Sequence, residues 1–376
     1  MVEEGSSGLA FLSLFTWIWR TEIMKVALDN QKLQYSGRID DSDPKRPQFI
    51  FPATSLGFRF FGRTATLKVQ NKRVYWKNYV GAIVDGEQKT FELKDEGMTE
   101  LLLVDGEERE HEVLFFKRMD SCHELILEEL TLSEGSQLLE MPQKPKRKIE
   151  VYGDSVSAGE VSEAEEYRGQ VDPEHNGEYS NSWYSYGWIT ARKLNAQIHD
   201  IAQGGIALLD GTGWFCDPEF LGMESVWDKV HYNPEISPMT TWDFSRYTPD
   251  VVIVAIGQND NHPEDYMKED MECEKAIRWR THYKRWIESI RKTYPKAVIL
   301  LTTTILCHDK NWDRSIERIC EELKDDKIFH FLYSKNGCGT PGHIRGSEAE
   351  EMAQELSQYI ENLDQKISIW KEKETQ

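Results

Sequence analysis

The sequence of 376 residues has few cysteines, and none of them stand in a C-x-x-C pair. Scattered cysteines argue against a disulfide framework and against a thiolate metal site. The chain also lacks internal repeats and low-complexity tracts. We therefore expect reduced thiols, in the core or near the surface, and a reducing compartment. The six cysteines are Cys122, Cys216, Cys273, Cys307, Cys320 and Cys338.

Long apolar segments are also scarce. Residues 9–19 form an apolar run that is too short to span a bilayer. Glu3 and Glu4 precede this run, where a secretory signal would carry positive charge, and no small-residue cleavage site follows. Met24 begins a stretch that could itself be a translation start, so we interpret residues 1–24 as an N-terminal extension. The expected location is cytoplasmic.

Basic residues are outnumbered by acidic ones. Lys and Arg total 45 against 65 Asp and Glu, which gives a formal net charge of -20. Such a field repels nucleic acid and anionic lipid surfaces, so we expect neither as a partner, and no obligate protein partner is evident. The substrate is expected to be neutral or cationic. With 39% hydrophobic residues, the chain can form packed cores, and its length favours two domains.

Residues 25–140 are predicted to form an all-β domain, a β-sandwich of the jelly-roll type. Short strands alternate with turn residues such as Asp85-Gly86 and Asp105-Gly106, without helical periodicity. Residues 141–148 are basic and proline-containing and read as a linker. The predicted strands are 58–61, 64–69, 80–84, 89–93, 99–104 and 111–117.

Residues 149–366 alternate apolar strands with amphipathic helices, which predicts an α/β/α three-layer domain with a mostly parallel sheet. Two insertions, the acidic loop 160–181 and the stretch 211–247, are expected to shape a binding site. Residues 367–376 read as a polar tail. The predicted strands are 148–152, 197–201, 251–256, 297–303 and 328–332, and the predicted helices are 183–194, 274–294, 313–323 and 347–363.

Polar residues follow four of these strands on the edge where open α/β folds build their sites. Ser155 follows the first strand, Gly204 and Gly205 the second, Asn259 the third and His343 the fifth. A serine nucleophile needs a base, here His343, and donors for an oxyanion, here the Asn259 side chain and the amides of Ser155 and Gly204 or Gly205. Each segment alone could be an ordinary turn or surface loop. Their joint order favours catalysis.

This order, Gly-Asp-Ser, Gly, Gly-x-Asn-Asp and Gly-His, resembles that of the SGNH (GDSL-type) hydrolases. Position 157 is Ser, so the turn is not the Gly-x-Ser-x-Gly elbow of α/β-hydrolases. The stretches 35–40, 58–62 and 116–118, with Trp242-Asp243-Phe244, are similar to carbohydrate esterase family 2. That resemblance covers about residues 33–364. It implies a jelly roll before an SGNH domain, and removal of acetyl groups from plant-type polysaccharides or oligosaccharides such as xylan and mannan, without metal or organic cofactor.

One position departs from the SGNH pattern. Most such enzymes have an Asp three residues before the histidine, where this chain has Thr340. Some members of carbohydrate esterase family 2 work as a Ser-His dyad, in which a backbone carbonyl holds the far ring nitrogen. The resemblance therefore predicts a dyad with a carbonyl from the loop 337–341, and Asp309 or Asp313 as the alternative partner.

Aromatic residues beside the predicted edge offer faces on which sugars stack. Trp312 is the leading candidate to face the acyl or sugar group, because the resembling family places an aromatic there. Trp214 and Asp154 are further candidates for substrate contact. Two rival functions stay open: a carbohydrate-binding protein without catalysis, and an esterase for another acyl substrate.

Overall fold

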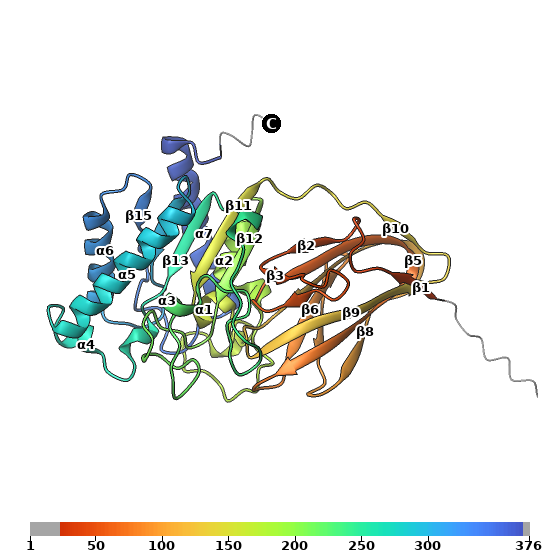
Figure 1. Cartoon of the computed structure of the whole chain (residues 1–376), viewed down its shortest axis with the longest axis horizontal. Coiled ribbons are helices and arrows are strands. Elements are labelled where there is room, and N and C mark those ends of the chain that lie inside the picture. Colours follow the sequence, from red (N-terminus) through yellow and green to blue (C-terminus); the bar gives the residue numbers. More distant parts are fainter. Residues whose placement is uncertain (1–22, 371–376) are drawn as a thin grey trace, which may run out of the picture.

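The computed structural model describes residues 23–370 as two domains that lie side by side along the long axis of the molecule (Figure 1). Residues 1–22 and 371–376, which hold nearly all of the predicted N-terminal extension and most of the predicted polar tail, lie outside the described residues. Within residues 23–370, no helix combines the length and the apolar composition needed to cross a membrane.

The N-terminal domain is one curled antiparallel sheet. Its long central strands β5 and β8 each merge two of the predicted strands and shift register at Gly62/Thr64 and at Ala65/Thr66, as β-bulges do. The Asp85-Gly86 turn, with positive φ at both residues, joins the predicted hairpin β6–β7. The strands are β1 (Ile23–Val26), β2 (Gln34–Ser36), β3 (Ile39–Asp40), β4 (Gln48–Phe49), β5 (Ser55–Arg73), β6 (Tyr79–Val84), β7 (Glu87–Glu92), β8 (Met98–Lys117), β9 (His123–Ser133) and β10 (Gln137–Leu139).

The C-terminal domain is built on a parallel sheet of five strands in the order β12-β11-β13-β14-β15. The chain order reverses at β11, so the crevice between its carboxyl end and those of its neighbours is the expected place for a ligand. The strands are β11 (Arg147–Gly153), β12 (Ala196–Ala202), β13 (Val251–Ala255), β14 (Val298–Thr302) and β15 (Ile328–His330).

Helices cover both faces of this sheet, because every residue of β13 and β14 is buried and apolar side chains of these strands point both ways. The helices α5 and α6 pack on one face, and α2 and α7 on the other. The main helices are α2 (Tyr186–Lys193), α5 (Glu274–Thr293), α6 (Lys310–Leu323) and α7 (Gly346–Ile367). The short ones are α1 (Ser155–Ala158), α3 (Met223–Val226) and α4 (Tyr266–Glu269), with 3₁₀ turns η1 (Glu165–Tyr167), η2 (Ser182–Tyr184), η3 (Phe244–Arg246) and η4 (Asn259–Asn261).

The two domains are joined by more than the segment between β10 and β11. Ile50 and Phe51 of the β-domain belong to one apolar core of the α/β domain, and Phe116 belongs to the other. Arg38 is fully buried at the junction, where it donates hydrogen bonds to the hydroxyl of Tyr152 (2.8 Å) and to Glu150 (3.3 Å). The domains therefore share buried surface and a buried ion pair.

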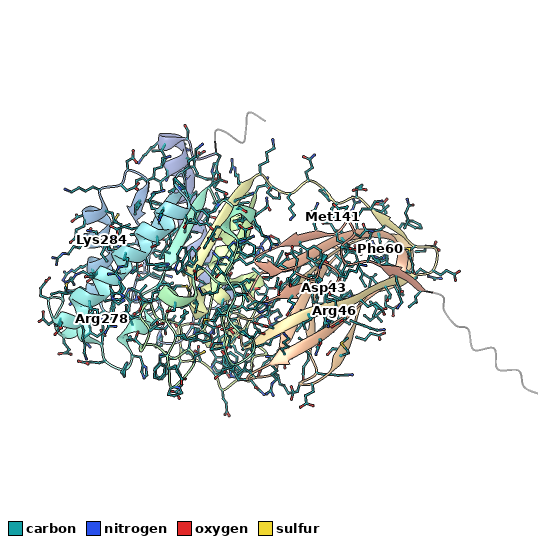
Figure 2. The ribbon with its side chains drawn as sticks, in the orientation of Figure 1. Asp43, Arg46, Phe60, Met141, Arg278 and Lys284 are labelled. Atoms are coloured by element: carbon teal, nitrogen blue, oxygen red, sulfur yellow. The ribbon has the colours of Figure 1, made fainter. Side chains whose placement is uncertain are left out.

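Charged residues are frequent on the outer faces, and each domain has a large apolar core. Figure 2 shows Arg278 and Lys284 on the outer side of α5, and Phe60, which is fully buried, within the β-domain.

Candidate active site

Ser155 stands where β11 passes into α1, at the reversal point of the sheet. Asp154 caps this short helix, and its side chain accepts a hydrogen bond from the Val156 amide (3.0 Å). Ser155 is the first helical residue, so its own N–H has no carbonyl acceptor within the helix. The turn thus presents a hydroxyl and a backbone donor at the same point.

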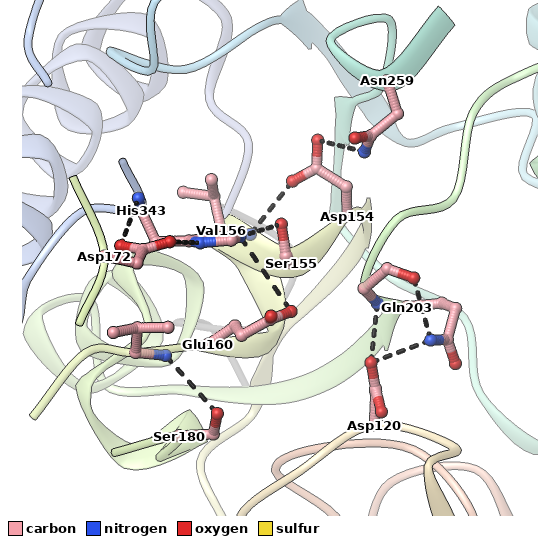
Figure 3. Close-up of polar contacts among 12 residues, drawn as sticks. Asp120, Asp154, Ser155, Val156, Glu160, Asp172, Ser180, Gln203, Asn259 and His343 are labelled. Carbon is pink, nitrogen blue, oxygen red and sulfur yellow. Dashed lines mark hydrogen bonds and ion pairs between the residues drawn. The ribbon is translucent and has the colours of Figure 1, made fainter. Parts of the chain in front are cut away.

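His343 lies in the loop before α7, and the structure brings it to Ser155 as predicted. Its Nε2 is 2.8 Å from Ser155 Oγ, although 188 positions separate the two residues (Figure 3). This distance suits transfer of the hydroxyl proton to the ring. The pair therefore has the geometry of a nucleophile and its base.

The far nitrogen of His343 is held by a carboxylate, so the predicted backbone carbonyl is wrong. Asp172 Oδ2 stands 2.6 Å from His343 Nδ1, and Asp172 Oδ1 accepts a hydrogen bond from the His343 amide (2.9 Å). The two alternatives are wrong as well. Asp309 caps α6, and Asp313 pairs with His308 (3.1 Å). The structure thus contains a Ser155–His343–Asp172 chain.

Asp172 reaches His343 from the acidic loop 160–181, which carries no periodic pattern. The buried Arg345 fixes it there, since its guanidinium donates to Asp172 Oδ1 (2.8 Å) and to the His343 carbonyl (2.6 Å). Gly342 permits the approach, because a Cβ at that position would lie 2.7 Å from Asp172 Oδ1. The Gly-His pair therefore serves the contact between two loops, a role that the sequence did not reveal.

Carboxylates dominate the electrostatics of the base. Burial opposes the charged ring, but Glu160, Asp172 and Asp154 outweigh it and raise the pKa of His343 to about 9. Burial likewise opposes the charged form of Asp172, yet His343 and Arg345 hold its pKa well below the usual range. The arrangement thus favours an imidazolium beside a carboxylate at neutral pH, and a neutral base only under alkaline conditions.

The predicted oxyanion donors lie on the same edge, but two of them are engaged. The Gly204 amide donates to Asp120 Oδ2 of the β-domain (2.7 Å). The Asn259 Nδ2 donates to the Ile206 carbonyl (3.0 Å) and, at 3.4 Å, to Asp154. Gly205 is in the left-handed region, with φ of 72°. Among the described residues, no acceptor contacts the amides of Ser155 and Gly205, so these two predicted donors remain available.

The prediction that Asp154 contacts substrate is wrong. Only 1% of its surface is exposed, and its Oδ2 accepts a hydrogen bond from Gln258 (2.6 Å) besides the contact with Asn259. Burial raises its pKa, although the bonds from Gln258 and Val156 favour the charged form. Asp154 therefore ties the serine turn to the loop after β13.

The prediction for Trp312 is also wrong. Helix α6 begins at Lys310, earlier than expected, and turns Trp312 into the core against Trp279 and Tyr266, so that none of its surface is exposed. Trp214 is different. It is 59% exposed and stacks on His262, with ring centroids 3.5 Å apart, directly beside Gly205. Trp214 is the aromatic surface next to the predicted oxyanion loop.

Three acidic residues near Ser155 escaped the sequence analysis: Asp120, Glu160 and Asp172. Asp120 comes from the loop before β9, so the β-domain contributes directly to the site. Glu160 and Asp172 belong to the acidic loop 160–181, for which the sequence predicts only that the loop as a whole shapes a binding site. Nothing in that loop distinguishes these two carboxylates from the five other acidic residues within 160–181.

Comparison with known proteins identifies relatives of both domains. Residues 35–142 match the carbohydrate esterase 2 N-terminal domain. The chain is 28% identical over 346 residues to the cellulase/esterase CelE of Acetivibrio thermocellus, covering 89% of this chain but 40% of that protein. It is 26% identical to the acetylxylan esterase/glucomannan deacetylase of Cellvibrio japonicus, covering 90% of each.

Solved structures agree with this comparison. A family two carbohydrate esterase from Clostridium thermocellum, in complex with cellohexaose, has a TM-score of 0.73 and 27% identity, covering 88% of this chain and 98% of that one. A family two carbohydrate esterase from Cellvibrio japonicus has the same fold, with a TM-score of 0.76 and 24% identity, covering 93% and 99%.

Proposed function

We propose that this chain, which carries the carbohydrate esterase 2 N-terminal domain and has the fold of family 2 carbohydrate esterases, is a serine esterase that removes O-acetyl groups from plant-type polysaccharides or oligosaccharides. The observation that carries the proposal is the hydrogen-bonded chain from Ser155 Oγ through His343 to Asp172. Such a chain supplies a nucleophile, a base and an anion that stabilises the charged base.

In the first half of the reaction, His343 Nε2 takes the proton of Ser155, and Oγ attacks the acetyl carbonyl carbon. The oxyanion receives hydrogen bonds from the amides of Ser155 and Gly205 and from Asn259, whose Nδ2 turns from its present acceptors. The imidazolium then gives its proton to the sugar oxygen, the C–O bond breaks, and the sugar leaves with a free hydroxyl. Acetyl-Ser155 remains.

In the second half, a water molecule gives a proton to His343 and attacks the acetyl carbon. Collapse of this second tetrahedral intermediate returns the proton to Ser155 and releases acetate. Asp172 keeps the ring oriented in both halves and stabilises its charge. The residues named here complete the cycle without a metal or an organic cofactor.

An acetylated carbohydrate is proposed as the substrate on three grounds. One relative is named a cellulase/esterase, and the other is named an acetylxylan esterase/glucomannan deacetylase. Trp214 presents an exposed ring beside the oxyanion loop, suited to the C–H face of a sugar. Xylan- and mannan-type chains are neutral, which fits a site lined by carboxylates.

We also propose that the β-domain has the jelly-roll topology. A cytoplasmic location is proposed as well, on the ground that the six cysteines are free.

The experiment is acetate release from a panel of acetylated xylo-, manno- and gluco-oligosaccharides, with Ser155→Ala as the control. Release by the parent protein and its loss in Ser155→Ala support the proposal. Binding of the same sugars without any release would favour a carbohydrate-binding protein, and hydrolysis of other esters only would favour a different acyl substrate.

A further inference from the structure

A carboxylate that the proposed mechanism does not use lies beside the base. Glu160 follows the αL cap of α1, and its backbone amide donates to the Ser155 carbonyl (3.0 Å). Its side chain is 13% exposed, and Oε2 stands 4.0 Å from His343 Nε2 (Figure 3). Among residues 23–370 no hydrogen-bond donor contacts this carboxyl group. Glu160 therefore acts on the ring through charge rather than through a hydrogen bond.

Glu160 meets a second carboxylate over Gly204. A Cβ on Gly204 would lie 2.7 Å from Glu160 Oε2 and 2.8 Å from Asp120 Oδ2, so only glycine fits between them. The two carboxylates differ in support. Asp120 accepts hydrogen bonds from Gly204 (2.7 Å), Gln203 (2.8 Å) and Cys122 (2.8 Å), whereas Glu160 has none. Glu160, which accepts no hydrogen bond from the described residues, is stabilised in its ionised form by the charge of His343.

Resting on the proposed esterase function, we propose that Glu160 is a positioning residue: its charge holds His343 as imidazolium in the substrate-free protein and so sets the pH at which Ser155 becomes a nucleophile. Asp172 and Glu160 then have separate tasks. Asp172 hydrogen-bonds Nδ1 and orients the ring, while Glu160 faces the Nε2 side and acts on the ring through its charge.

The charges around the ring support this division. Asp172, Asp154 and Glu160 favour the imidazolium, and Arg345 and His175, which lie near Asp172, do not cancel them. Glu160 is the strongest of the charges that raise the pKa of His343 to about 9, and burial raises its own pKa to about 7. Between these values both groups are charged, and a charge pair about 4 Å apart interacts strongly at a partly buried site.

The sign of the effect follows directly. Removal of an anion that faces an imidazolium lowers the pKa of that imidazolium, so the neutral base becomes available at lower pH. We therefore expect kcat/KM of the parent protein to keep rising up to about pH 9. In Glu160→Gln we expect the rise in kcat/KM to end at least about one pH unit lower. A shift of one pKa unit corresponds to about 1.4 kcal/mol, which the lost attraction between Glu160 and the imidazolium can supply.

The test measures kcat/KM against pH with an aryl acetate for the parent protein, Glu160→Gln and Glu166→Gln. Glu166 is an exposed residue of the same loop, so its variant matches the change in net charge. The His343 Cε1–H resonance is titrated by NMR in the same proteins, and His343→Gln identifies that resonance.

A downward shift in both the rate profile and the His343 titration, in Glu160→Gln but not in Glu166→Gln, supports the proposal. If kcat/KM of Glu160→Gln has the same pH dependence as the parent protein but a lower plateau, Glu160 has a merely structural role and the proposal is overturned. An equal shift in Glu166→Gln overturns it too, because net charge would then suffice. If no protein hydrolyses the ester, the esterase function fails, while the NMR titration still decides the influence of Glu160 on His343.

Discussion

Asp172 and His343 are 171 positions apart in the chain, yet Asp172 Oδ2 lies 2.6 Å from His343 Nδ1. The contact joins an irregular loop after α1 to the loop before α7, and Arg345 holds both of its sides. It turns a predicted Ser-His pair into a three-residue chain. We therefore expect Asp172 to contribute to catalysis.

Replacement of Asp172 by Asn is expected to lower kcat on the order of 10⁴-fold. The amide keeps the size of the side chain but neither carries the charge that stabilises the imidazolium nor selects the ring tautomer that accepts the Ser155 proton. Steady-state hydrolysis of an aryl acetate measures the effect. Asp309→Asn is the matched control, because Asn caps α6 as well as Asp does. A large loss in Asp309→Asn together with near-normal turnover in Asp172→Asn would make Asp309 the acid instead.

Loss of the Asn259 side chain is expected to lower kcat by about 10²-fold or more, because one donor to the oxyanion disappears. KM for a small acetate ester should change little. Asn261→Ala, in the same 3₁₀ turn, serves as the control for local structure. Near-normal turnover by Asn259→Ala would show that Nδ2 only braces the Ile206 carbonyl and Asp154.

Truncation of Trp214 to Ala is expected to raise KM for acetylated oligosaccharides several-fold, toward tenfold, since a stacked ring contributes about 1 kcal/mol. The rate with a small alkyl acetate, which has no sugar face, should stay the same. Trp312→Phe provides the contrast, because Trp312 is buried and should affect stability rather than KM. A rise in KM for Trp312→Phe alone would reverse the two assignments.

A buried histidine between the domains predicts a pH-dependent stability. His231 Nδ1 lies 2.9 Å from Glu124 and Nε2 2.9 Å from Asp40, so both nitrogens face carboxylates of the β-domain. Burial opposes the charged ring, but the two carboxylates outweigh it and raise the pKa of His231, while the pKa of Asp40 is lowered against its own burial. The charged ring therefore stabilises the domain junction.

His231→Gln should accordingly lower the free energy of unfolding by about 2 kcal/mol near pH 6. The stabilisation from a raised pKa is complete below the unfolded value of about 6.5 and is lost as pH rises through the folded value. On the acid side it is lost only as pH falls through the lowered pKa of Asp40. Urea unfolding across this range measures the difference between the two proteins. A difference that grows toward about pH 9 would contradict the assignment.

The parallel sheet and the serine-histidine pair could be predicted from the sequence, because apolar strands and the polar residues after them form clear patterns. Apolar runs bounded by turns predicted all five parallel strands, and parallel strands bring their carboxyl ends to one edge whatever the loops do. Ser155, Gly204 and Asn259 each follow such a strand within four residues, whereas His343 comes 13 residues after the end of β15. The sheet topology therefore brings the first three to one edge, and the loop that carries His343 starts from the same edge.

Residues on long loops escaped prediction for a physical reason. The position of Asp172 depends on Arg345 and Gly342, which are distant in sequence, and no local period encodes that contact. The prediction for Trp312 was wrong for a different reason. Asp309 is a good cap residue, and a helix starting at Lys310 places Trp312 on its buried face, so a helix start three residues earlier would have corrected the prediction.

The most direct test of the central claim is detection of the acetyl-Ser155 intermediate. Brief incubation with an acetylated oligosaccharide, acid quench and mass spectrometry of the peptide around Ser155 should find one acetyl group on that serine in the parent protein. Asn259→Ala should accumulate less of it, and Ser155→Ala none. Acetate release at full rate by Ser155→Ala, or an acetyl group on another residue in its place, would contradict the account.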